Sequence, residues 1–260
     1  MTAMADLPAL THSLDRVVVI EAPRDVVFRY FTDTARWARW WGAGSTIDAR
    51  PGGRMYIRYP DGTEAIGEVI EVNAPERIAF TYGYVSGKMI APGGSRVTIR
   101  LDADARGTRL HFMHEFSEAE VRDVHVQGWR YQLSVFSNVV ANELHAGAPS
   151  IVDEWFAAWA ETDAARRRAR LDAIAVTGIS FRDRFSLIDG LDDLNEQIGA
   201  SQRFMPGLRM ERRGEVSLCQ GTAVAEWIIL SPDGQERGRG TNVYRLGPHG
   251  KLESVVGLWR

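Results

Sequence analysis

Residues 108–144 read TRLHFMHEFSEAEVRDVHVQGWRYQLSVFSNVVANEL, and this stretch decides the fold of the first half of the chain. Apolar and polar residues alternate as far as Phe116, which predicts a strand. Ser117, with Glu120 three positions later, is a capping-box signal for a helix start. Beyond it, apolar side chains recur at steps of three or four: Trp129, Leu133, Phe136, Val140 and Leu144. The stretch therefore predicts a strand that leads into a long amphipathic helix.

Upstream of this stretch, the sequence predicts an antiparallel meander and one short helix. Period-two alternation bounded by turn signals indicates strands at residues 16–21, 54–59, 64–72, 77–84 and 96–102. The sequence Pro60-Asp61-Gly62 has the φ preferences that a chain reversal needs. Pro23 suits the first turn of a helix, and apolar residues follow it at helical spacing, so residues 23–32 should be helical.

The small, flexible segment at residues 145–149, His-Ala-Gly-Ala-Pro, interrupts the long helix and predicts a domain boundary. We place the domains at residues 1–146 and 147–260. Helices are predicted from residue 150, at 163–174 and at 191–204, and strands at 179–183, 208–218, 222–230, 235–246 and 251–259. Helices followed by an antiparallel sheet indicate an α+β domain.

Composition limits the classes of protein that this chain can belong to. The chain has 260 residues, of which 45% are apolar, and its net charge of -3 argues against a nucleic-acid or anionic-membrane partner. The single Cys219 closes no intrachain disulfide, which fits a reducing compartment. No apolar run approaches the roughly 20 residues of a membrane helix, and residues 1–14 lack the basic start of a secretory signal. We expect a cytoplasmic protein with a frayed start and no membrane insertion.

Short motifs over residues 14–144 resemble those of one known family. They are Ala22-Pro23, Trp40-Trp41-Gly42, Arg50-Pro51-Gly52-Gly53-Arg54, Gly67-Glu68-Val69, Gly107-Thr108 and Gly128-Trp129. With these motifs the first half resembles a START-like (SRPBCC) domain of the Hsp90-ATPase-activator-homologue, or AHSA1-like, type. The resemblance implies a helix-grip fold, in which an antiparallel sheet and a long C-terminal helix enclose a cavity.

Other motifs give the second half a different resemblance. They are Phe181-Arg182-Asp183, Gly190-Leu191-Asp192, Pro206-Gly207, Asp233-Gly234 and the run from Gly238 to Trp259. Residues 150–259 are similar to SnoaL-like members of the NTF2-like family. This resemblance implies an α+β cone domain with a cavity of its own, so the whole chain is expected to be α+β with two domains.

Both resemblances imply a small hydrophobic or amphipathic ligand, held in the START-like cavity, with a second pocket or a homodimer face in the NTF2-like domain. Two alternatives stay open: a polyketide-cyclase or isomerase-like enzyme, and a chaperone-associated or stress-related regulatory module. The sequence contains no recognisable metal or cofactor motif, and we expect neither.

Two ionisable residues of the first half are candidates for lining its cavity. Regular alternation places Glu68 on the same face as Ile66, Ile70 and Val72, and His114 on the same face as Phe112, and we expect both faces to point toward the long helix. A buried carboxylate or imidazole is costly without a partner, so an inward position would be informative. Alternatively, both side chains form hydrogen bonds with neighbouring residues, or Glu68 lies beyond the part of the sheet that the helix covers. Three tyrosines either add hydroxyl groups to the cavity or simply pack: Tyr56, Tyr82 and Tyr84.

Asp183 is the candidate general base of the second half, because it ends a predicted strand directly after Phe181-Arg182. A carboxylate that is desolvated in an aromatic pocket has a raised pKa and can accept a proton from a carbon acid. The alternative is a surface turn or a pair with Arg182 or Arg184. Residues expected to line its pocket are Trp155, Trp159, Phe185, Trp227, Asn242 and Tyr244. Glu226 is a weaker candidate, because alternation puts it opposite Trp227.

Three further features have simpler interpretations. The tryptophans Trp37, Trp40 and Trp41 predict a packed corner rather than a lid. The basic run at residues 166–168, with Arg170, predicts a solvated helix face. Cys219, at a strand end, predicts a buried or half-buried small residue rather than a nucleophile.

Overall fold

The computed structural model describes residues 9–260, which form two compact units. The N-terminal unit ends at Val140 and the C-terminal unit comprises Ala141–Arg260, so the division falls within helix α3 (Ala119–Leu144). The boundary expected between residues 146 and 147 stays a prediction. The frayed start expected at residues 1–14 lies mostly outside the described residues, and the first strand begins at His12.

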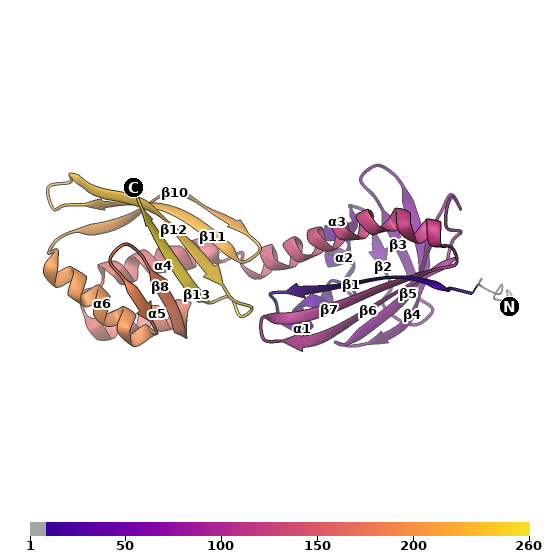
Figure 1. Cartoon of the computed structure of the whole chain (residues 1–260), viewed down its shortest axis with the longest axis horizontal. Helices are drawn as coiled ribbons and strands as arrows, with labels where there is room; N and C mark the ends of the chain where they lie inside the picture. Colours follow the sequence, from indigo (N-terminus) through magenta and orange to yellow (C-terminus); the bar gives the residue numbers. More distant parts are fainter. Residues whose placement is uncertain (1–8) are drawn as a thin grey trace. The chain divides into compact units, whose positions relative to one another are not determined.

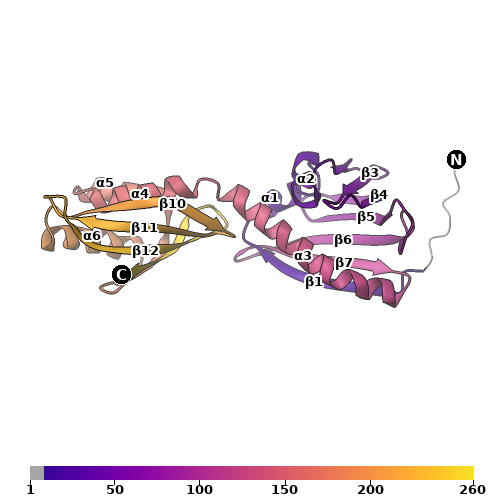
Figure 2. The same cartoon turned by 90° about the horizontal axis from the view of Figure 1, so that it is seen from above.

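The N-terminal unit is a seven-stranded antiparallel sheet with helices on one face, and α3 runs across that sheet (Figure 2). Its elements before α3 are β1 (His12–Ile20), α1 (Arg24–Arg29), α2 (Thr34–Trp41), β2 (Thr46–Ile47), β3 (Arg54–Arg58), β4 (Glu64–Asn73), β5 (Arg77–Tyr84), β6 (Ser95–Asp104) and β7 (Gly107–Phe116). The strand order is β1-β7-β6-β5-β4-β3-β2, which is the predicted meander with β1 added beside β7. Helix α2 was not predicted as a separate element. It is capped by Asp33, whose side chain accepts a hydrogen bond from the Arg36 amide.

An irregularity in β4 overturns one predicted face. The register of β4 against β5 shifts between Val69 and Glu71, so the residues on either side of this bulge do not follow one alternation. Before the bulge Val69 is buried, whereas Glu68 and Ile70 are exposed. The inward position predicted for Glu68 and Ile70 is therefore wrong. The corresponding prediction for β7 is confirmed, because Phe112 and His114 are both buried.

Aromatic side chains fill the corner between α2, α3 and the sheet. Trp37, Trp40 and Trp41 are buried, as predicted for a packed corner. The ring of Trp40 lies 4.9 Å from that of Phe136 on α3, and Trp37 meets Phe80 on β5 edge-on at 5.8 Å. Edge-to-face pairs of this kind add to the stabilisation from apolar burial. They fix α2 at one end of the groove between α3 and the sheet.

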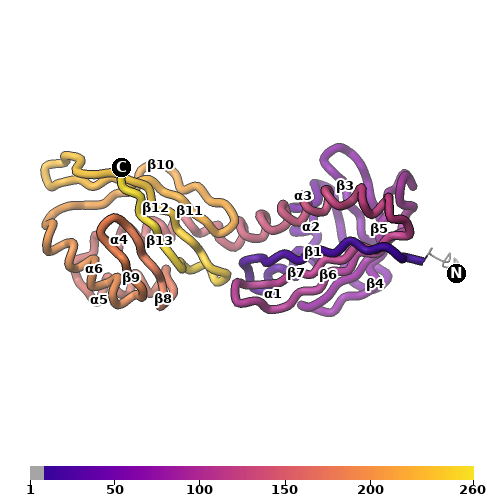
Figure 3. Tube along the Cα trace, in the orientation of Figure 1, coloured from indigo at the N-terminus to yellow at the C-terminus, as the bar shows by residue number. Residues whose placement is uncertain are grey.

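The C-terminal unit is a six-stranded mixed sheet with helices packed on one face (Figures 1 and 3). Its elements are α4 (Ala148–Ala160), α5 (Ala164–Ile174), β8 (Ala175–Arg182), β9 (Leu187–Asp189), α6 (Leu191–Phe204), β10 (Arg209–Cys219), β11 (Thr222–Leu230), β12 (Glu236–Leu246) and β13 (Leu252–Trp259). The strand order is β10-β11-β12-β13-β8-β9, with β8 parallel to β13. The predicted elements are present, β9 is additional, and the α+β fold class expected for both halves is confirmed.

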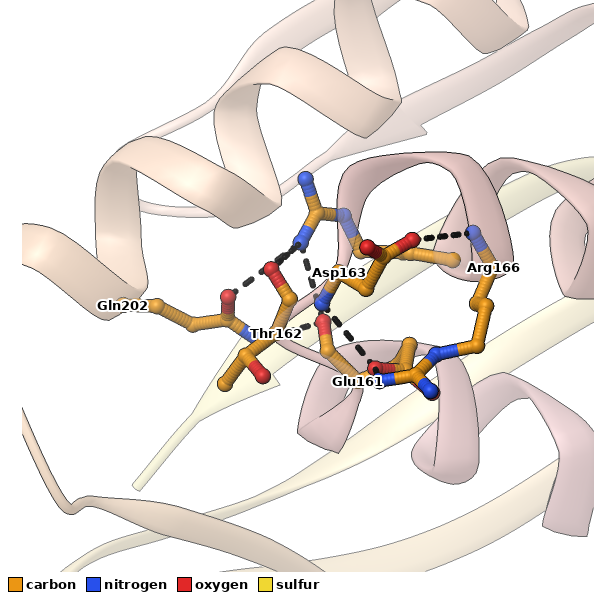
Figure 4. Close-up of polar contacts among 6 residues, drawn as sticks. Glu161, Thr162, Asp163, Arg166 and Gln202 are labelled. Atoms are coloured by element: carbon orange, nitrogen blue, oxygen red, sulfur yellow. Dashed lines mark hydrogen bonds and ion pairs between the residues drawn. The ribbon is translucent and has the colours of Figure 1, made fainter.

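A buried arginine joins the helices of this unit and corrects the prediction of a fully solvated basic face. Arg167 on α5 is only 3% exposed, and its guanidinium donates to the Glu161 carbonyl at 2.9 Å and to Gln202 Oε1 on α6 at 3.2 Å. Gln202 in turn donates to the Glu161 carbonyl at 3.0 Å, and Asp163 caps α5 by accepting from the Arg166 amide (Figure 4). The neighbouring arginines of the run stay at the surface in ion pairs.

Candidate functional site

The N-terminal unit encloses a cavity of about 710 Å³ between the sheet and the helices α2 and α3. Its wall comes from α2, the β3–β4 turn, the end of β5, the loop that follows β5, and the middle of α3. The aromatic wall residues are Trp40, Trp41, Tyr59, Tyr82, Tyr84, Trp129 and Tyr131, and the remaining wall residues with polar side chains are Arg39, Asp61, Thr63, Ser86, Lys88, His125 and Gln132. A mostly apolar hollow with a few convergent polar groups is the usual anatomy of a small-molecule site.

Sheet register brings the polar groups of this site together. Tyr82 on β5 lies opposite Ser95 on β6, and Val97 on β6 lies opposite His114 on β7. Because side chains alternate between faces, these residues all point to the side of the sheet that α3 covers. His125 and Trp129 are four residues apart on α3, so they share the helix face that looks back at the sheet.

His114 is a fully satisfied, neutral imidazole behind the cavity wall. Trp129 Nε1 donates to His114 Nδ1 at 2.9 Å, and His114 Nε2 lies 2.8 Å from Ser95 Oγ. Ser95 Oγ donates to the Tyr82 carbonyl at 2.8 Å, so it accepts the Nε2 proton of His114. This assignment of the tautomer follows from the hydrogen-bond network. Burial, followed by the nearby His125, lowers the pKa of His114 well below its ordinary value.

Tyr84 and His125 form the second polar pair, and both lie in the cavity wall. His125 Nδ1 donates to the Val121 carbonyl at 2.7 Å, one turn earlier on α3, which leaves Nε2 as an acceptor. Tyr84 therefore donates its hydroxyl proton to Nε2 across 3.1 Å. Burial lowers the pKa of His125. The pair presents the Tyr84 oxygen, as a neutral hydrogen-bonding atom, to the cavity.

Two further tyrosines share a hydrogen bond at the sheet side of the cavity. The hydroxyl groups of Tyr59 and Tyr82 are 2.9 Å apart. One hydroxyl donates to the other, so the two phenols are hydrogen-bond partners of one another. Burial raises the pKa of both phenols, so both stay protonated at neutral pH. Tyr59 and Tyr82 therefore face the cavity as uncharged side chains.

The structure separates the predicted residues of the first half into three groups. Tyr82 and Tyr84 line the cavity, and His114 lies directly behind its wall. Tyr56 sits on the opposite face of β3 from the buried Met55 and bonds to Glu64. Glu68 is exposed, as described above. Tyr59, His125 and Trp129 also line the cavity and were not predicted, although the four-residue spacing of His125 and Trp129 on a predicted helix was a usable signal.

The C-terminal unit has its own cavity, of about 530 Å³, in which Asp183 lies among aromatic and methionine side chains. Asp183 Oδ1 accepts from the Phe185 amide at 2.8 Å, and Oδ2 accepts from Trp259 Nε1 at 3.2 Å. The first bond closes the turn that follows β8, and the second fixes the carboxylate against β13. Other wall residues are Trp159, Phe185, Gln202, Phe204, Met205, Met210 and Arg237.

The remaining predicted residues of the second half belong to the core rather than to the cavity wall. Trp155, Trp227 and Tyr244 are buried in the hydrophobic core. Trp227 Nε1 donates to Asn242 Oδ1 at 2.8 Å, and Asn242 Nδ2 donates to the Tyr244 hydroxyl at 3.1 Å, so these polar groups satisfy one another. Of the predicted aromatic residues, Trp159 and Phe185 do line the cavity. Trp259, which was not predicted as a site residue, donates the hydrogen bond to Asp183.

Several other side chains add nothing to either site. Glu226 is exposed and pairs with Arg260 at 3.0 Å. Cys219 is exposed, so the buried or half-buried position predicted for it is wrong. Within residues 9–260 no cluster of three or more potential metal-ligating side chains occurs, and no helix there is long and apolar enough to cross a membrane.

Residues 21–141 match the family described as Activator of Hsp90 ATPase homolog 1-like protein. The match spans most of the N-terminal unit and somewhat less than half of the chain. These residues therefore form an AHSA1-like domain of the START type, as the sequence motifs implied. No curated protein matches the chain.

Solved structures resemble parts of the chain. A protein from Agrobacterium tumefaciens str. C58, described as an isomerase of the SnoaL-like family, is 26% identical, with a TM-score of 0.42 over 45% of this chain and 98% of that one. CalU16 from Micromonospora echinospora is 24% identical, with a TM-score of 0.39 over 51% of this chain and 76% of that one. The Aha1 dimer from Colwellia psychrerythraea is 14% identical, with a TM-score of 0.42 over 47% of this chain and 91% of that one.

Proposed function

We propose that the N-terminal unit binds a small hydrophobic or amphipathic molecule in the cavity between its sheet and α3. The observation that supports this most directly is the wall itself, which is aromatic on both sides and encloses about 710 Å³. That volume falls in the range of about 300–1,000 Å³ typical of small-molecule sites. The C-terminal cavity, of about 530 Å³, supplies a second pocket.

The polar groups of the cavity favour a ligand with one or two oxygen or nitrogen atoms rather than a fully apolar one. Tyr84 offers an oxygen whose proton is donated to His125, and the hydroxyl groups of Tyr59 and Tyr82 share a hydrogen bond beside it. A fully apolar ligand would leave the remaining acceptor capacity of these oxygens unused when it displaced water, which carries a penalty. A ligand hydroxyl or amine satisfies them.

A fluorescent probe tests binding in this cavity. N-phenyl-1-naphthylamine is neutral, has two aromatic parts and one N–H, and becomes more fluorescent in an apolar site. Gly128 on α3 lies in the cavity wall, and a Cβ added there meets no atom within 4 Å. We expect Gly128→Phe to fill the cavity mouth and to weaken probe binding by at least about tenfold.

Two variants control for side effects of that substitution. Gly128→Ala removes the glycine without filling the cavity, and Ser134→Phe adds the same ring at an exposed position of α3 outside the wall. Both should bind the probe as the unaltered protein does. Ala200→Phe narrows the C-terminal cavity and reports any binding there. Equal probe affinity in Gly128→Phe and Ser134→Phe would refute the proposal.

A second candidate function rests on the position of Asp183 in an aromatic cavity. In this alternative the C-terminal unit is a polyketide-cyclase or isomerase-like enzyme, and Asp183 removes a proton from carbon next to a ketone. The carboxylate has one lone-pair direction left on each oxygen after its bonds to Phe185 and Trp259. The proton would pass to that carboxylate and return to the substrate or to water.

Proton exchange measures this activity without knowledge of the natural substrate. Loss of the α-proton NMR signal of 1-phenylbutane-1,3-dione in deuterium oxide should be faster with the protein than without it. Asp183→Asn keeps one acceptor oxygen and should abolish the acceleration while the protein stays folded. Equal acceleration by the protein and by Asp183→Asn would remove Asp183 as the base.

Three finer expectations stay proposals. A chaperone-associated role is suggested by the description of the matched family, and a pull-down with Hsp90 that recovers no complex counts against it. A homodimer through the second sheet is tested by native mass spectrometry, where a monomer at micromolar concentration counts against it. A cytoplasmic location is supported by the lack of any second cysteine and is tested by cell fractionation.

A further inference from the structure

Three side chains with a formal charge lie in the wall of the N-terminal cavity. Within the wall, the basic side chains are Arg39 on α2 and Lys88 in the loop after β5, and the acidic one is Asp61 in the β3–β4 turn. Asp61 is engaged in its own turn, where Oδ1 accepts from the Thr63 amide at 2.9 Å. In the part of the chain that the structure describes, the Lys88 ammonium group has no hydrogen bond or ion pair. The wall therefore offers a cation without a protein partner.

The loop that carries Lys88 is held in a defined shape. The Tyr84 amide donates to the Ile90 carbonyl at 3.0 Å, and the Ile90 side chain is buried, so the loop is folded back onto the end of β5. Between these residues Met89 has a φ of 66°, in the left-handed region that residues other than glycine seldom adopt. Met89 and Lys88 both lie in the cavity wall. Strained loop residues that persist at a cavity point to a functional role for the loop.

The interior of the cavity has no group that can neutralise a ligand charge. Its polar side chains away from Arg39, Lys88 and Asp61 are phenols, an imidazole, hydroxyls and an amide. A charge placed among them without a partner would cost several kcal/mol of desolvation. An ionic group on a ligand must therefore lie beside the charged wall residues. The whole chain has a net charge of -3, so the positive charge here is a local feature.

We propose that this cavity takes an aromatic or similarly planar molecule that carries an anionic group, with the rings among the tryptophans and tyrosines and the anion beside Lys88 and Arg39. This inference rests on the proposed function and narrows its ligand to aromatic acids. A carboxylate, sulfonate or phosphate shares the required chemistry, because each accepts hydrogen bonds from ammonium and guanidinium groups.

A matched pair of probes separates this inference from the proposed function. 8-Anilinonaphthalene-1-sulfonate has the same ring system as N-phenyl-1-naphthylamine and adds one sulfonate. Lys88→Gln should weaken binding of the sulfonate probe by about threefold to fivefold, the range of a partly exposed ion pair, and leave the neutral probe within about twofold. Asp61→Asn should strengthen binding of the sulfonate probe, because it removes a like charge. Raising the salt from about 20 mM to about 300 mM should weaken only the sulfonate probe.

The chain supplies a control for the lysine. Its one other lysine, Lys251, lies in the C-terminal unit and donates to the Asp172 carbonyl. Lys251→Gln should leave both affinities unchanged. In amine acetylation followed by mass spectrometry, the sulfonate probe should slow modification of Lys88 and not of Lys251.

The outcomes are distinguishable. If the neutral probe binds in a way that Gly128→Phe blocks, but the sulfonate probe is insensitive to Lys88→Gln and to Asp61→Asn, the anionic ligand is refuted and the proposed function stands. If neither probe binds in a way that Gly128→Phe blocks, the proposed function and this inference both fail. Acetylation of Lys88 at the same rate with and without the sulfonate probe also overturns the inference.

Discussion

Trp129 Nε1 on α3 donates a hydrogen bond of 2.9 Å to His114 Nδ1 on β7. Both side chains are buried, so the bond joins the long helix to the sheet inside the N-terminal core. The same indole ring lies 4.0 Å from that of Phe112 and forms part of the cavity wall. The bond therefore helps to hold in place the helix face that forms one side of the candidate site.

Loss of the His114 side chain should destabilise the N-terminal unit strongly. His114→Ala leaves a void and removes the partners of Trp129 and Ser95, and we expect it to lower the free energy of unfolding by about 3 kcal/mol. His111→Ala is the matched control, because His111 is on the other face of the same strand and pairs with Asp102 at the surface. It should cost less than about 1 kcal/mol. Urea unfolding measures both, and equal losses would contradict the structural role of His114.

The stability of the protein should fall as the pH drops below neutrality. Burial lowers the pKa of His114, His125 and His145 from the ordinary value of 6.5. Below pH 6.5 the unfolded chain binds protons that the folded protein excludes, so the stabilisation is complete above that pH and is lost as the pH falls. Over the pH range in which it stays neutral in the folded protein, each of these histidines lowers the free energy of unfolding by about 1.4 kcal/mol for each pH unit of decrease.

Urea unfolding at about pH 7.5, 6.5 and 5.5 measures this slope. His114→Gln removes one of the three buried imidazoles and should give a shallower dependence on pH. His111→Gln is the matched control for the substitution itself, because His111 lies on the other face of the same strand. Parallel pH profiles for His114→Gln and the unaltered protein would show that His114 is not the excluded proton site.

Arg167 should matter far more than its neighbour in the same basic run. Arg167→Ala removes the donor to Gln202 Oε1 and to Asn195 Oδ1, both partly buried, and should cost about 3 kcal/mol. Arg168→Ala removes only surface ion pairs with Asp172 and Asp192, and should cost less than about 1 kcal/mol. Thermal unfolding of the two variants distinguishes these values. A larger loss in Arg168→Ala would contradict the buried network.

Asn242 should act as a structural residue of the C-terminal core. Asn242→Ala leaves the Trp227 indole N–H unpaired, and should lower the free energy of unfolding by about 2–3 kcal/mol. Glu226→Ala, on the exposed face of the neighbouring strand, should change it by less than about 1 kcal/mol. Chemical unfolding followed by tryptophan fluorescence measures both. If Asn242→Ala were as stable as Glu226→Ala, the hydrogen-bond chain would not stabilise the core.

Most elements of the fold could be read from local patterns. The predicted strand at residues 77–84 and the predicted helix at 191–204 coincide with β5 and α6. Alternation and helical spacing are properties of a few neighbouring residues, so a sequence displays them directly. The exceptions are short or irregular. β2 and β9 are too short to show a period, and the bulge in β4 reversed the face on which Glu68 lies.

The candidate sites could be predicted only in part. Tyr82, Tyr84, Asp183 and Trp159 were selected from the sequence and do line cavities. Trp227 and Tyr244 were selected as well, but both are buried in the hydrophobic core. The position of a side chain along a strand does not show how deeply the helices cover it, so the sequence could not separate core residues from wall residues. Lining residues from distant segments, such as Tyr59 and Lys88, had no local signal.

Local patterns in the sequence were sufficient for most of the helices and strands, for the α+β class of both halves and for the family resemblance of the first, since these depend on short-range periodicity and on motifs. Which side chains meet became clear from the three-dimensional packing alone. The pairing of His125 with Tyr84, and of Asp183 with Trp259, joins residues 41 and 76 positions apart. Such contacts depend on strand register and on how the helices pack against the sheets, which are set by packing across the whole domain.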